Sequence, residues 1–208
     1  MFINYDPFII IISSPSGAGK TTICRMIVNS DPSIKLSVSA TTRKKRPQEI
    51  SGQDYFFVSE KDFLSMKNSQ QFLEDALVFN NLYGSPKKTA EEEIKKGNCV
   101  LFDIDWQGAR QIKEKLPKEM VISIFILPPS LQELERRLRA RAQDSEEIVA
   151  QRMQEALQEI SHYNEYDFVL INDDLENSLK NIRAIIETKR ISRQNVKELI
   201  ETNNFLKK

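Results

Sequence analysis

The stretch "SSPSGAGKTT" at residues 13–22 decides the fold, together with the apolar run "FIIII" directly before it at residues 8–12. A continuous β-branched run is typical of a strand that is buried on both faces of a parallel sheet. Residues 21–29, which follow, have the pattern of a helix. A strand, a glycine-containing turn and a helix in this order form the context of a phosphate-binding loop.

The turn fits the loop pattern G-x-x-x-x-G-K-[ST] in its second half, where Gly19, Lys20 and Thr21 stand. Ser14 occupies the leading position, where the pattern has glycine, and is tolerated there if its φ is negative. Inward-facing N–H groups and the positive end of the helix favour a phosphate, with Lys20 on the β- and γ-phosphates and Thr21 on Mg²⁺. The alternative is a plain strand-to-helix turn with an exposed lysine. We expect the phosphates of a nucleotide, with Mg²⁺, to be bound by Ser16, Gly17, Ala18, Gly19, Lys20, Thr21 and Thr22. The loop alone does not distinguish a kinase from a GTPase or a motor.

Strand and helix patterns alternate along most of the chain. Further apolar runs typical of buried strands lie at residues 99–104, 121–127 and 168–171. Helical patterns lie at residues 88–96, 108–116, 131–141, 146–160 and 175–191. This alternation predicts an α/β fold with a parallel-sheet core flanked by helices. Residues 39–91 break the rhythm, with a short strand pattern at 54–58 and a short helix at 61–66, and they predict an inserted lobe.

Composition excludes several classes of protein. The chain has 208 residues, with 30 Lys and Arg against 30 Asp and Glu, so it lacks the basic excess of a nucleic-acid binder. Its two cysteines give neither a disulfide framework nor a metal-binding spacing. No run approaches the ~20 apolar residues of a membrane span, and no targeting signal is recognisable. We therefore expect a cytoplasmic protein that binds neither membranes nor nucleic acids.

Several stretches resemble the guanylate kinase family when they are taken together and in order. They are "SVSATTRKKRP" (37–47), "GQDYF" (52–56), "FLE" (72–74), "YGS" (83–85), "DIDWQG" (103–108) and "INDD" (171–174). The resemblance runs from about residue 8 to residue 186. It implies one guanylate kinase-like domain over residues 1–208, with a core at 1–38 and 92–208, a GMP-binding lobe at 39–91 and a mobile lid at about 128–159.

The resemblance also implies which residues hold GMP. Arg43, Arg46, Tyr55 and Tyr83 match the clamp on the monophosphate, and guanidinium groups suit phosphate oxygens. Glu74 matches the residue that reads guanine in the family. A carboxylate suits that role, since it only accepts hydrogen bonds and guanine offers two donors on one edge. Further contacts to the base or ribose are expected from Ser39, Ser85 and Asp105.

Three arginines match the lid of the family, namely Arg137, Arg141 and Arg152. Such arginines neutralise charge on the transferring phosphoryl group. The alternative is a solvated helix face on which arginines pair with glutamates. Asn172 matches a residue near the ATP base. Asp103, at the end of a predicted strand, either holds Mg²⁺ through water or orients GMP, or it only caps the strand end.

The resemblance implies direct in-line transfer from ATP to GMP, and to dGMP, with Lys20, Arg46, Arg141 and Arg152 as the catalytic residues. Two other readings are weighed against it. One is a kinase for a phosphorylated sugar such as ribose bisphosphate, and the other is a non-catalytic guanylate kinase-like interaction module. The oligomeric state is left open.

Overall fold

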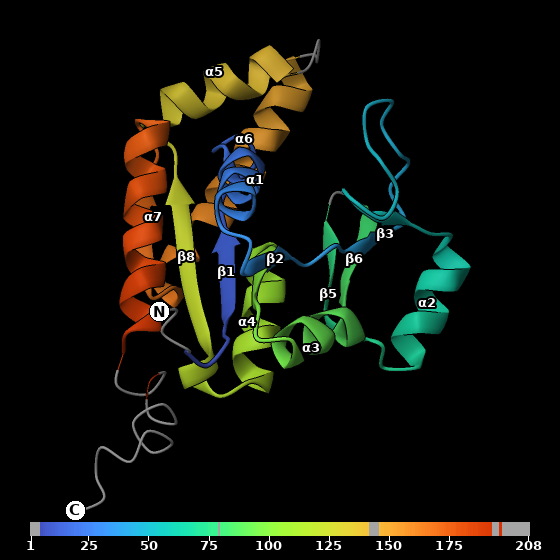
Figure 1. Ribbon diagram of the computed structural model, residues 1–208. Coiled ribbons are helices and arrows are strands. Elements are labelled where there is room, and N and C mark those ends of the chain that lie inside the picture. Colours follow the sequence, from blue (N-terminus) through green and yellow to red (C-terminus); the bar gives the residue numbers. More distant parts are fainter. Residues whose placement is uncertain (1–4, 79, 142–145, 193–195, 197–208) are drawn as a thin grey trace, which may run out of the picture.

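A five-stranded parallel sheet forms the centre of the molecule (Figure 1). The computed structural model describes residues 5–78, 80–141, 146–192 and 196. The strand order is β2 (Ile34–Leu36), β7 (Cys99–Asp103), β1 (Ile9–Ser13), β8 (Val121–Leu127) and β9 (Phe168–Ile171), with every neighbouring pair parallel. The expected α/β class and parallel-sheet core are confirmed, while β2 is an additional strand that no sequence pattern predicted.

Four helices cover the two faces of this sheet: α1 (Lys20–Ser30), α3 (Lys87–Lys95), α4 (Trp106–Lys115) and α7 (Leu175–Arg190). Side chains of a strand alternate between the faces. In β1, Ile10 and Ile12 pack with α1 and α7, whereas Ile9 and Ile11 pack with α3 and α4. Both faces of β1 are therefore apolar, which explains why the strand reads as one unbroken hydrophobic run.

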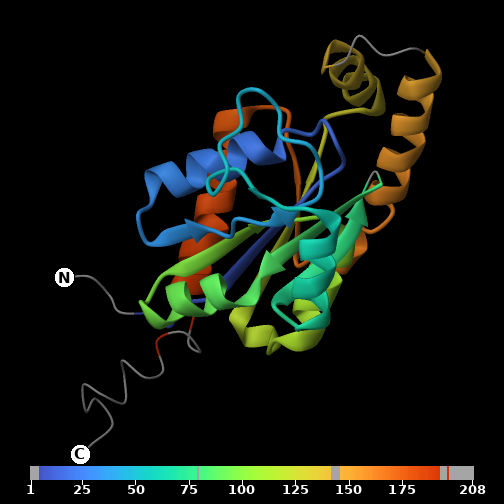
Figure 2. The same ribbon diagram turned by 90° about the vertical axis from the view of Figure 1, so that its right-hand side faces the viewer.

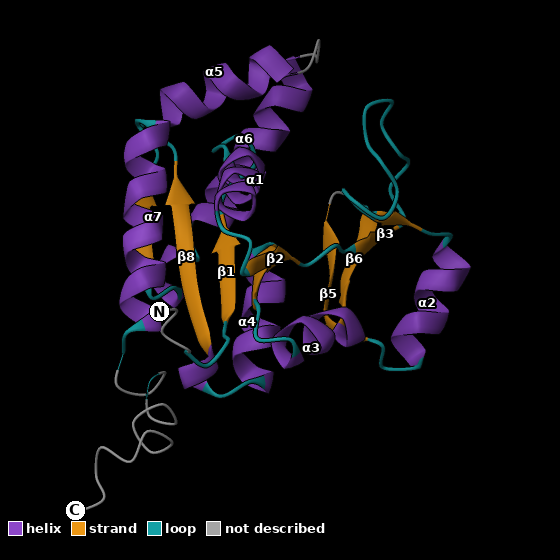
Figure 3. Ribbon diagram, in the orientation of Figure 1, coloured by secondary structure: helices purple, strands orange, loops and turns teal. Residues whose placement is uncertain are grey.

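A second, smaller sheet lies beside the first and is built from residues between β2 and α3 (Figure 3). Its strand order is β4 (Phe56–Phe57), β3 (Ala40–Thr41), β6 (Asn81–Pro86) and β5 (Phe72–Val78). Helix α2 (Glu60–Asn68) covers it through a small core of Ala40, Phe63 and Phe72. The strand predicted at 54–58 shortens to β4, because a turn with Gly52 at φ 83° occupies the chain just before it.

Two further helices stand beyond the upper ends of the strands in the view of Figure 1. They are α5 (Leu131–Arg141) and α6 (Glu146–Ile160), and their bounds are those predicted from the sequence. Leu134 and Leu138 of α5 pack on Ala156 of α6. Figure 2 shows this pair projecting away from the sheet on the side of the phosphate loop. A role of residues 128–159 as a lid, and of 39–91 as a separate lobe, stays a prediction.

The carboxyl ends of β1 and β7 meet at the same edge of the main sheet, because their register pairs Ile12 with Asp103. Ligands of open α/β sheets bind outside this edge. Two 3₁₀ turns, Lys118–Met120 and Tyr163–Glu165, complete the described elements. None of the helices within the described ranges is long and apolar enough to cross a membrane.

Candidate active site

The turn between β1 and α1 depends on two glycines in left-handed conformations. Gly17 has φ 95° and Gly19 has φ 98°, values that side chains of L-residues rarely tolerate. A Cβ on Gly19 would lie 2.8 Å from Nδ2 of Asn172, and one on Gly17 would lie 3.1 Å from Cδ1 of Leu134. Both backbone shape and close packing therefore require glycine, as expected for a phosphate-binding loop.

Ser14, in place of the leading glycine, causes no backbone strain. Among the described non-glycine residues, only Gln70 and Asn80 have a positive φ. The Ser14 hydroxyl is buried and donates to the carbonyl oxygen of Pro15 at 3.0 Å. The departure from the pattern is thus compatible with an intact loop.

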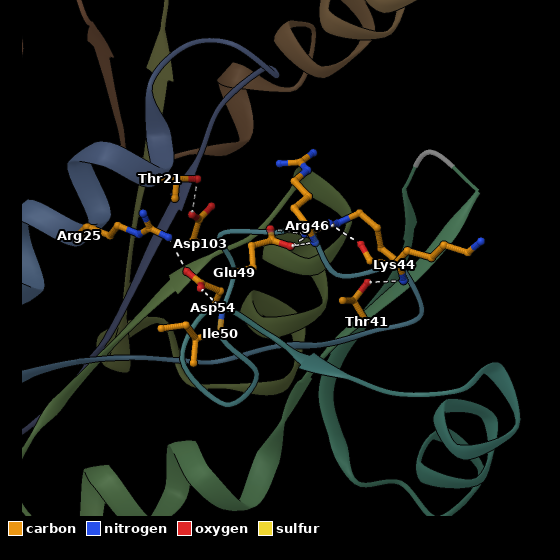
Figure 4. A network of polar contacts seen from close by, with 10 residues as sticks. Thr21, Arg25, Thr41, Lys44, Arg46, Glu49, Ile50, Asp54 and Asp103 are labelled. Atoms are coloured by element: carbon orange, nitrogen blue, oxygen red, sulfur yellow. Dashed lines mark hydrogen bonds and ion pairs between the residues drawn. The ribbon is translucent and has the colours of Figure 1, made fainter. Parts of the chain in front are cut away.

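Lys20, the first residue of α1, is bound to the end of β7. Its ammonium group donates to Oδ1 of Asp103 and, at 3.3 Å, to the carbonyl oxygen of Ile104. The Thr21 hydroxyl donates to Oδ2 of Asp103 at 3.1 Å (Figure 4). Burial alone lowers the pKa of Lys20, but the Asp103 carboxylate outweighs it and holds that pKa above its usual value. Lys20 is therefore a fixed positive charge at the mouth of the loop.

The two aspartates that follow β7 have different local tasks. Asp103 binds Lys20 and Thr21, and its expected roles toward Mg²⁺ and GMP stay predictions. Asp105 is the N-cap of α4, where its carboxylate accepts from the N–H of Gly108 at 3.0 Å. Asp105 therefore acts as a local helix cap, and its contact with GMP stays a prediction.

Two side chains from distant parts of the chain support the phosphate loop. Asn172 donates to the carbonyl oxygen of Ala18 at 2.8 Å and accepts from the Ser178 hydroxyl at 3.0 Å. Its amide thus stabilises the loop, while the expected contact with the ATP base stays a prediction. Glu159, near the end of α6, accepts from the N–H of Ser16 at 3.0 Å. Burial raises the pKa of Glu159 to about 7.

A chain of buried polar groups lies in the smaller sheet. Glu74 is 2% exposed, and its Oε1 accepts from the Ser85 hydroxyl at 2.5 Å. The Ser39 hydroxyl lies 3.0 Å from that of Ser85. When Glu74 is ionised it only accepts, so Ser85 donates to Glu74 and Ser39 donates to Ser85. Burial raises the pKa of Glu74 to about 7, with Asp105 and Asp75 adding to the effect.

The expected phosphate clamp assembles around a tyrosine pair. The rings of Tyr55 and Tyr83 meet edge to face, with centroids 5.8 Å apart. The Arg43 guanidinium lies 5.3 Å from the centroid of the Tyr55 ring and pairs with Glu49 at 2.6 Å. Glu49 also accepts from the N–H of Arg46 at 2.7 Å, and Figure 4 shows the Arg46 side chain extending away from it. Arg43, Tyr55 and Tyr83 are thus brought together, and Arg46 is joined to them through its backbone N–H and Glu49.

Two links connect this clamp with the phosphate loop. Burial raises the pKa of Tyr55, and the Asp103 carboxylate contributes to that rise, so the two groups lie within electrostatic reach. Arg25 of α1 forms an ion pair with Asp54, in the loop before β4 (Figure 4). Exposed pairs of this kind contribute ~0–1 kcal/mol. Asp103 and Tyr55 thus lie within electrostatic reach of each other, and the Arg25–Asp54 pair joins α1 to the loop before β4.

Comparisons with known proteins identify the family of this chain. The family model described as guanylate kinase matches residues 7–189. This chain belongs to the guanylate kinase family. The guanylate kinase of Paramagnetospirillum magneticum is 50% identical over 185 residues, covering 89% of this chain and 86% of that protein. That of Zymomonas mobilis is 52% identical over 184 residues, covering 88% and 85%. The crystal structure of guanylate kinase from Anaplasma phagocytophilum has a TM-score of 0.77 and 36% identity, covering 96% of this chain and 95% of that one.

The arginines that match the lid of guanylate kinases lie on α5 and α6. Arg137 pairs with Glu133 at 2.7 Å, which is the helix-face pairing that the sequence analysis weighed against a lid role. Arg141 is the last residue of α5, and its side chain lies outside what the structure describes. Arg152 lies on α6. The contacts of these arginines with ATP and with the transferring group stay predictions.

Sequence reasoning missed several residues at this guanylate kinase site. Glu49 and Glu159 bind the clamp and the loop, yet each reads as an ordinary surface glutamate. Glu159 is 143 residues from Ser16, so no local pattern could pair them. Gly108 carries a usable signal, since a glycine three residues after an N-cap aspartate is unfavourable inside a helix.

Proposed function

We propose that this protein transfers the terminal phosphoryl group of ATP to GMP, and also to dGMP, and so produces ADP and the guanosine diphosphate. The observation that carries the proposal is the bond of Lys20 with Asp103 at the phosphate loop, with Tyr55 of the clamp within electrostatic reach of both. Donor and acceptor phosphates held on these two sides would lie end to end. Phosphoryl transfer needs mainly such positioning and charge neutralisation.

The donor side would hold the ATP phosphates on the N–H groups of residues 16–22. The positive end of α1 and the fixed charge of Lys20 both favour an anion there. Phosphate oxygens of ATP would replace Oδ1 of Asp103 as the partner of the Lys20 ammonium group. Lys20 can then follow the charge that develops on the β- and γ-phosphates.

The Mg²⁺ that accompanies ATP has suitable groups beside the loop. The Thr21 hydroxyl and the Asp103 carboxylate are neighbouring oxygen groups, 3.1 Å apart, and Mg²⁺ prefers oxygen ligands. We propose that Thr21 ligates the ion and that Asp103 lies in its outer shell. When bound, the ion neutralises charge on the phosphates.

The acceptor side would hold GMP between the clamp and Glu74. Arg43 and Arg46 would bind the phosphate with the phenols of Tyr55 and Tyr83. Glu74 would accept from N1–H and the amino group of guanine, with Ser39 and Ser85 aligning its carboxylate. Asp105, at the N-terminus of α4, would add a contact to the base.

Closure of α5 and α6 over the two nucleotides would complete the site. We propose that residues 128–159 move as a lid, and that Arg137, Arg141 and Arg152 then reach the phosphates. Arg137 would leave Glu133 for a phosphate oxygen, a stronger partner for a guanidinium group. Closure also excludes water, which would otherwise compete with GMP for the phosphoryl group. We place this reaction in the cytoplasm, where ATP is available to it.

The test is a coupled assay of ADP release with purified protein, ATP and one acceptor at a time. GMP and dGMP should support turnover, whereas AMP, CMP, UMP and ribose bisphosphate should not. Rapid turnover with ribose bisphosphate would favour a sugar-phosphate kinase, and no turnover with any acceptor would favour a non-catalytic module. Neither alternative has support among the relatives of this chain.

GMP affinity should rise with pH up to about 7, because guanine needs the ionised form of Glu74. Its raised pKa means that the neutral carboxyl is favoured in the empty fold, so folding stability from this group is lost as the pH rises from 4.5 to about 7. Below that pKa, GMP affinity should fall by about tenfold per pH unit. Calorimetric titration of the protein with GMP from pH 5.5 to 8.5 measures this affinity.

Glu74→Gln is the control for this pH dependence. The phosphate of GMP itself titrates at a pKa of about 6, and that part of the slope should remain in the variant. The part that belongs to Glu74 should disappear. Identical slopes in both proteins would remove Glu74 from the pH dependence of binding.

A further inference from the structure

Gly108 lies in the first turn of α4, three residues after the N-cap Asp105. Its φ does not fall in the left-handed region, so the backbone itself would accept another residue. Glycine weakens a helix relative to alanine because it loses more conformational freedom on folding. Something other than backbone geometry must therefore favour glycine at this position.

The carboxylate of Glu74 occupies the space where a side chain at position 108 would begin. A Cβ on Gly108 would lie 2.4 Å from Oε2 of Glu74, 3.0 Å from Cδ and 3.3 Å from Cγ. The chain has six glycines, and this is the shortest clearance at any of them, followed by 2.8 Å at Gly19. Carbon atoms in good contact are about 3.5–4.0 Å apart, so even an alanine does not fit.

Glu74 has little freedom to move out of the way. It is 2% exposed, and Ser85 holds its other oxygen at 2.5 Å. Rotation of the carboxylate alone would not remove the conflict, because Cδ and Cγ also lie too close. A side chain at 108 would have to displace the whole Glu74 side chain and break its bond with Ser85.

We propose that Gly108 is a positioning residue for guanine selection: its missing side chain leaves the space in which the carboxylate of Glu74 is held. This inference rests on the proposed function, because it takes Glu74 as the group that reads guanine. Gly108 itself touches no substrate. It acts by letting the first turn of α4 approach the carboxylate closely.

The experiment is a double-mutant cycle of Gly108→Ala with Glu74→Ala, which isolates their interaction. In the wild-type background, Gly108→Ala should lower Tm, because the new methyl group collides with Glu74. In the Glu74→Ala background, the same change should raise Tm, because the collision is gone and alanine favours the helix. The opposite signs are the expected signature. Failure of Gly108→Ala to fold, with a folded double variant, gives the same answer.

Steady-state kinetics provide the readout that a purely structural role would not move. Gly108→Ala should raise KM for GMP by about 10- to 100-fold and reduce the preference for GMP over AMP, as expected of a small misplacement. KM for ATP should stay the same. In the Glu74→Ala background, Gly108→Ala should leave KM for GMP unchanged.

The outcomes separate this inference from the proposed function. If Gly108→Ala raises Tm in both backgrounds, the clearance is not needed and the inference is wrong, whatever the substrate. If the effect of Gly108→Ala on Tm has opposite signs in the two backgrounds but KM for GMP stays the same, the positioning role is wrong. If Glu74→Ala itself leaves the GMP preference intact, the assignment of Glu74 under the proposed function fails instead.

Discussion

Replacing Lys20 with alanine is expected to lower turnover by about 10³-fold or more while the chain still folds. The Lys20 ammonium group is a permanent charge, held at the end of β7 by Asp103 and the carbonyl oxygen of Ile104. Without it, nothing in the described part of the loop replaces a side-chain cation on the β- and γ-phosphates. Turnover is measured by coupled ADP release at saturating GMP, and folding by thermal melting.

The variant also leaves the carboxylate of Asp103 without its cation. Lys20 and Asp103 are 19% and 18% exposed, so the loss should cost about 1–3 kcal/mol of unfolding free energy. Adding Asp103→Asn should restore part of that stability without restoring turnover. Lys88→Ala is the matched control, because Lys88 is an 88% exposed lysine on α3. Normal turnover in Lys20→Ala would end the assignment of the phosphate loop.

The donor side could be predicted from the sequence because its determinants are local. The run at 8–12, the glycines at 17 and 19 and the start of α1 are consecutive, and each has a conformational signature of its own. Parallel strands buried on both faces leave unbroken apolar runs, which located β7, β8 and β9 to within one residue. Local chemistry and global packing agree throughout this part of the chain.

The smaller sheet was harder to predict, because its strand β5 packs on one face against α2 and on the other against the core of the main sheet. In β5, Phe72 packs in the small core with α2, whereas Leu73 packs in the core beneath α4. A register shift between Phe72 and Glu74 further disturbs the alternation. A strand of this kind shows no clean period of two, so only the family resemblance identified Glu74.

The residue pairs that support the site could not be predicted from the sequence, even where one member, such as Gly108, carries a signal of its own. Ser16 with Glu159, and Gly108 with Glu74, are pairs brought together by the packing of separate elements. The sequence shows that each residue is present but not what it faces. Pairing of this kind depends on distances in three dimensions, which propensity and periodicity do not contain.

Replacing Glu74 with glutamine is expected to remove most of the discrimination between GMP and AMP, which a site built on paired hydrogen bonds can raise to ~10⁴ or more. Glutamine has nearly the same shape, so the clearance over Gly108 remains sufficient. Ser85 can still donate to its amide oxygen. The amide NH₂ then faces the base, where it meets the N1–H donor of guanine but suits the N1 acceptor of adenine.

The measurement is kcat/KM for GMP and AMP with Glu74→Gln, because selectivity is the ratio of these constants. The loss should appear mainly as a fall for GMP, with a smaller rise for AMP, since the clamp of Arg43 and Arg46 on the phosphate is unchanged. Glu60→Gln is the matched control, because Glu60 is exposed on helix α2, which covers the same sheet. It should leave the ratio of the two constants unchanged. Because the charge of Glu74 is buried, its removal should also raise stability above pH 7, where the wild-type carboxylate is ionised. A variant that is more stable above pH 7 but equally selective would mean that the base is read elsewhere.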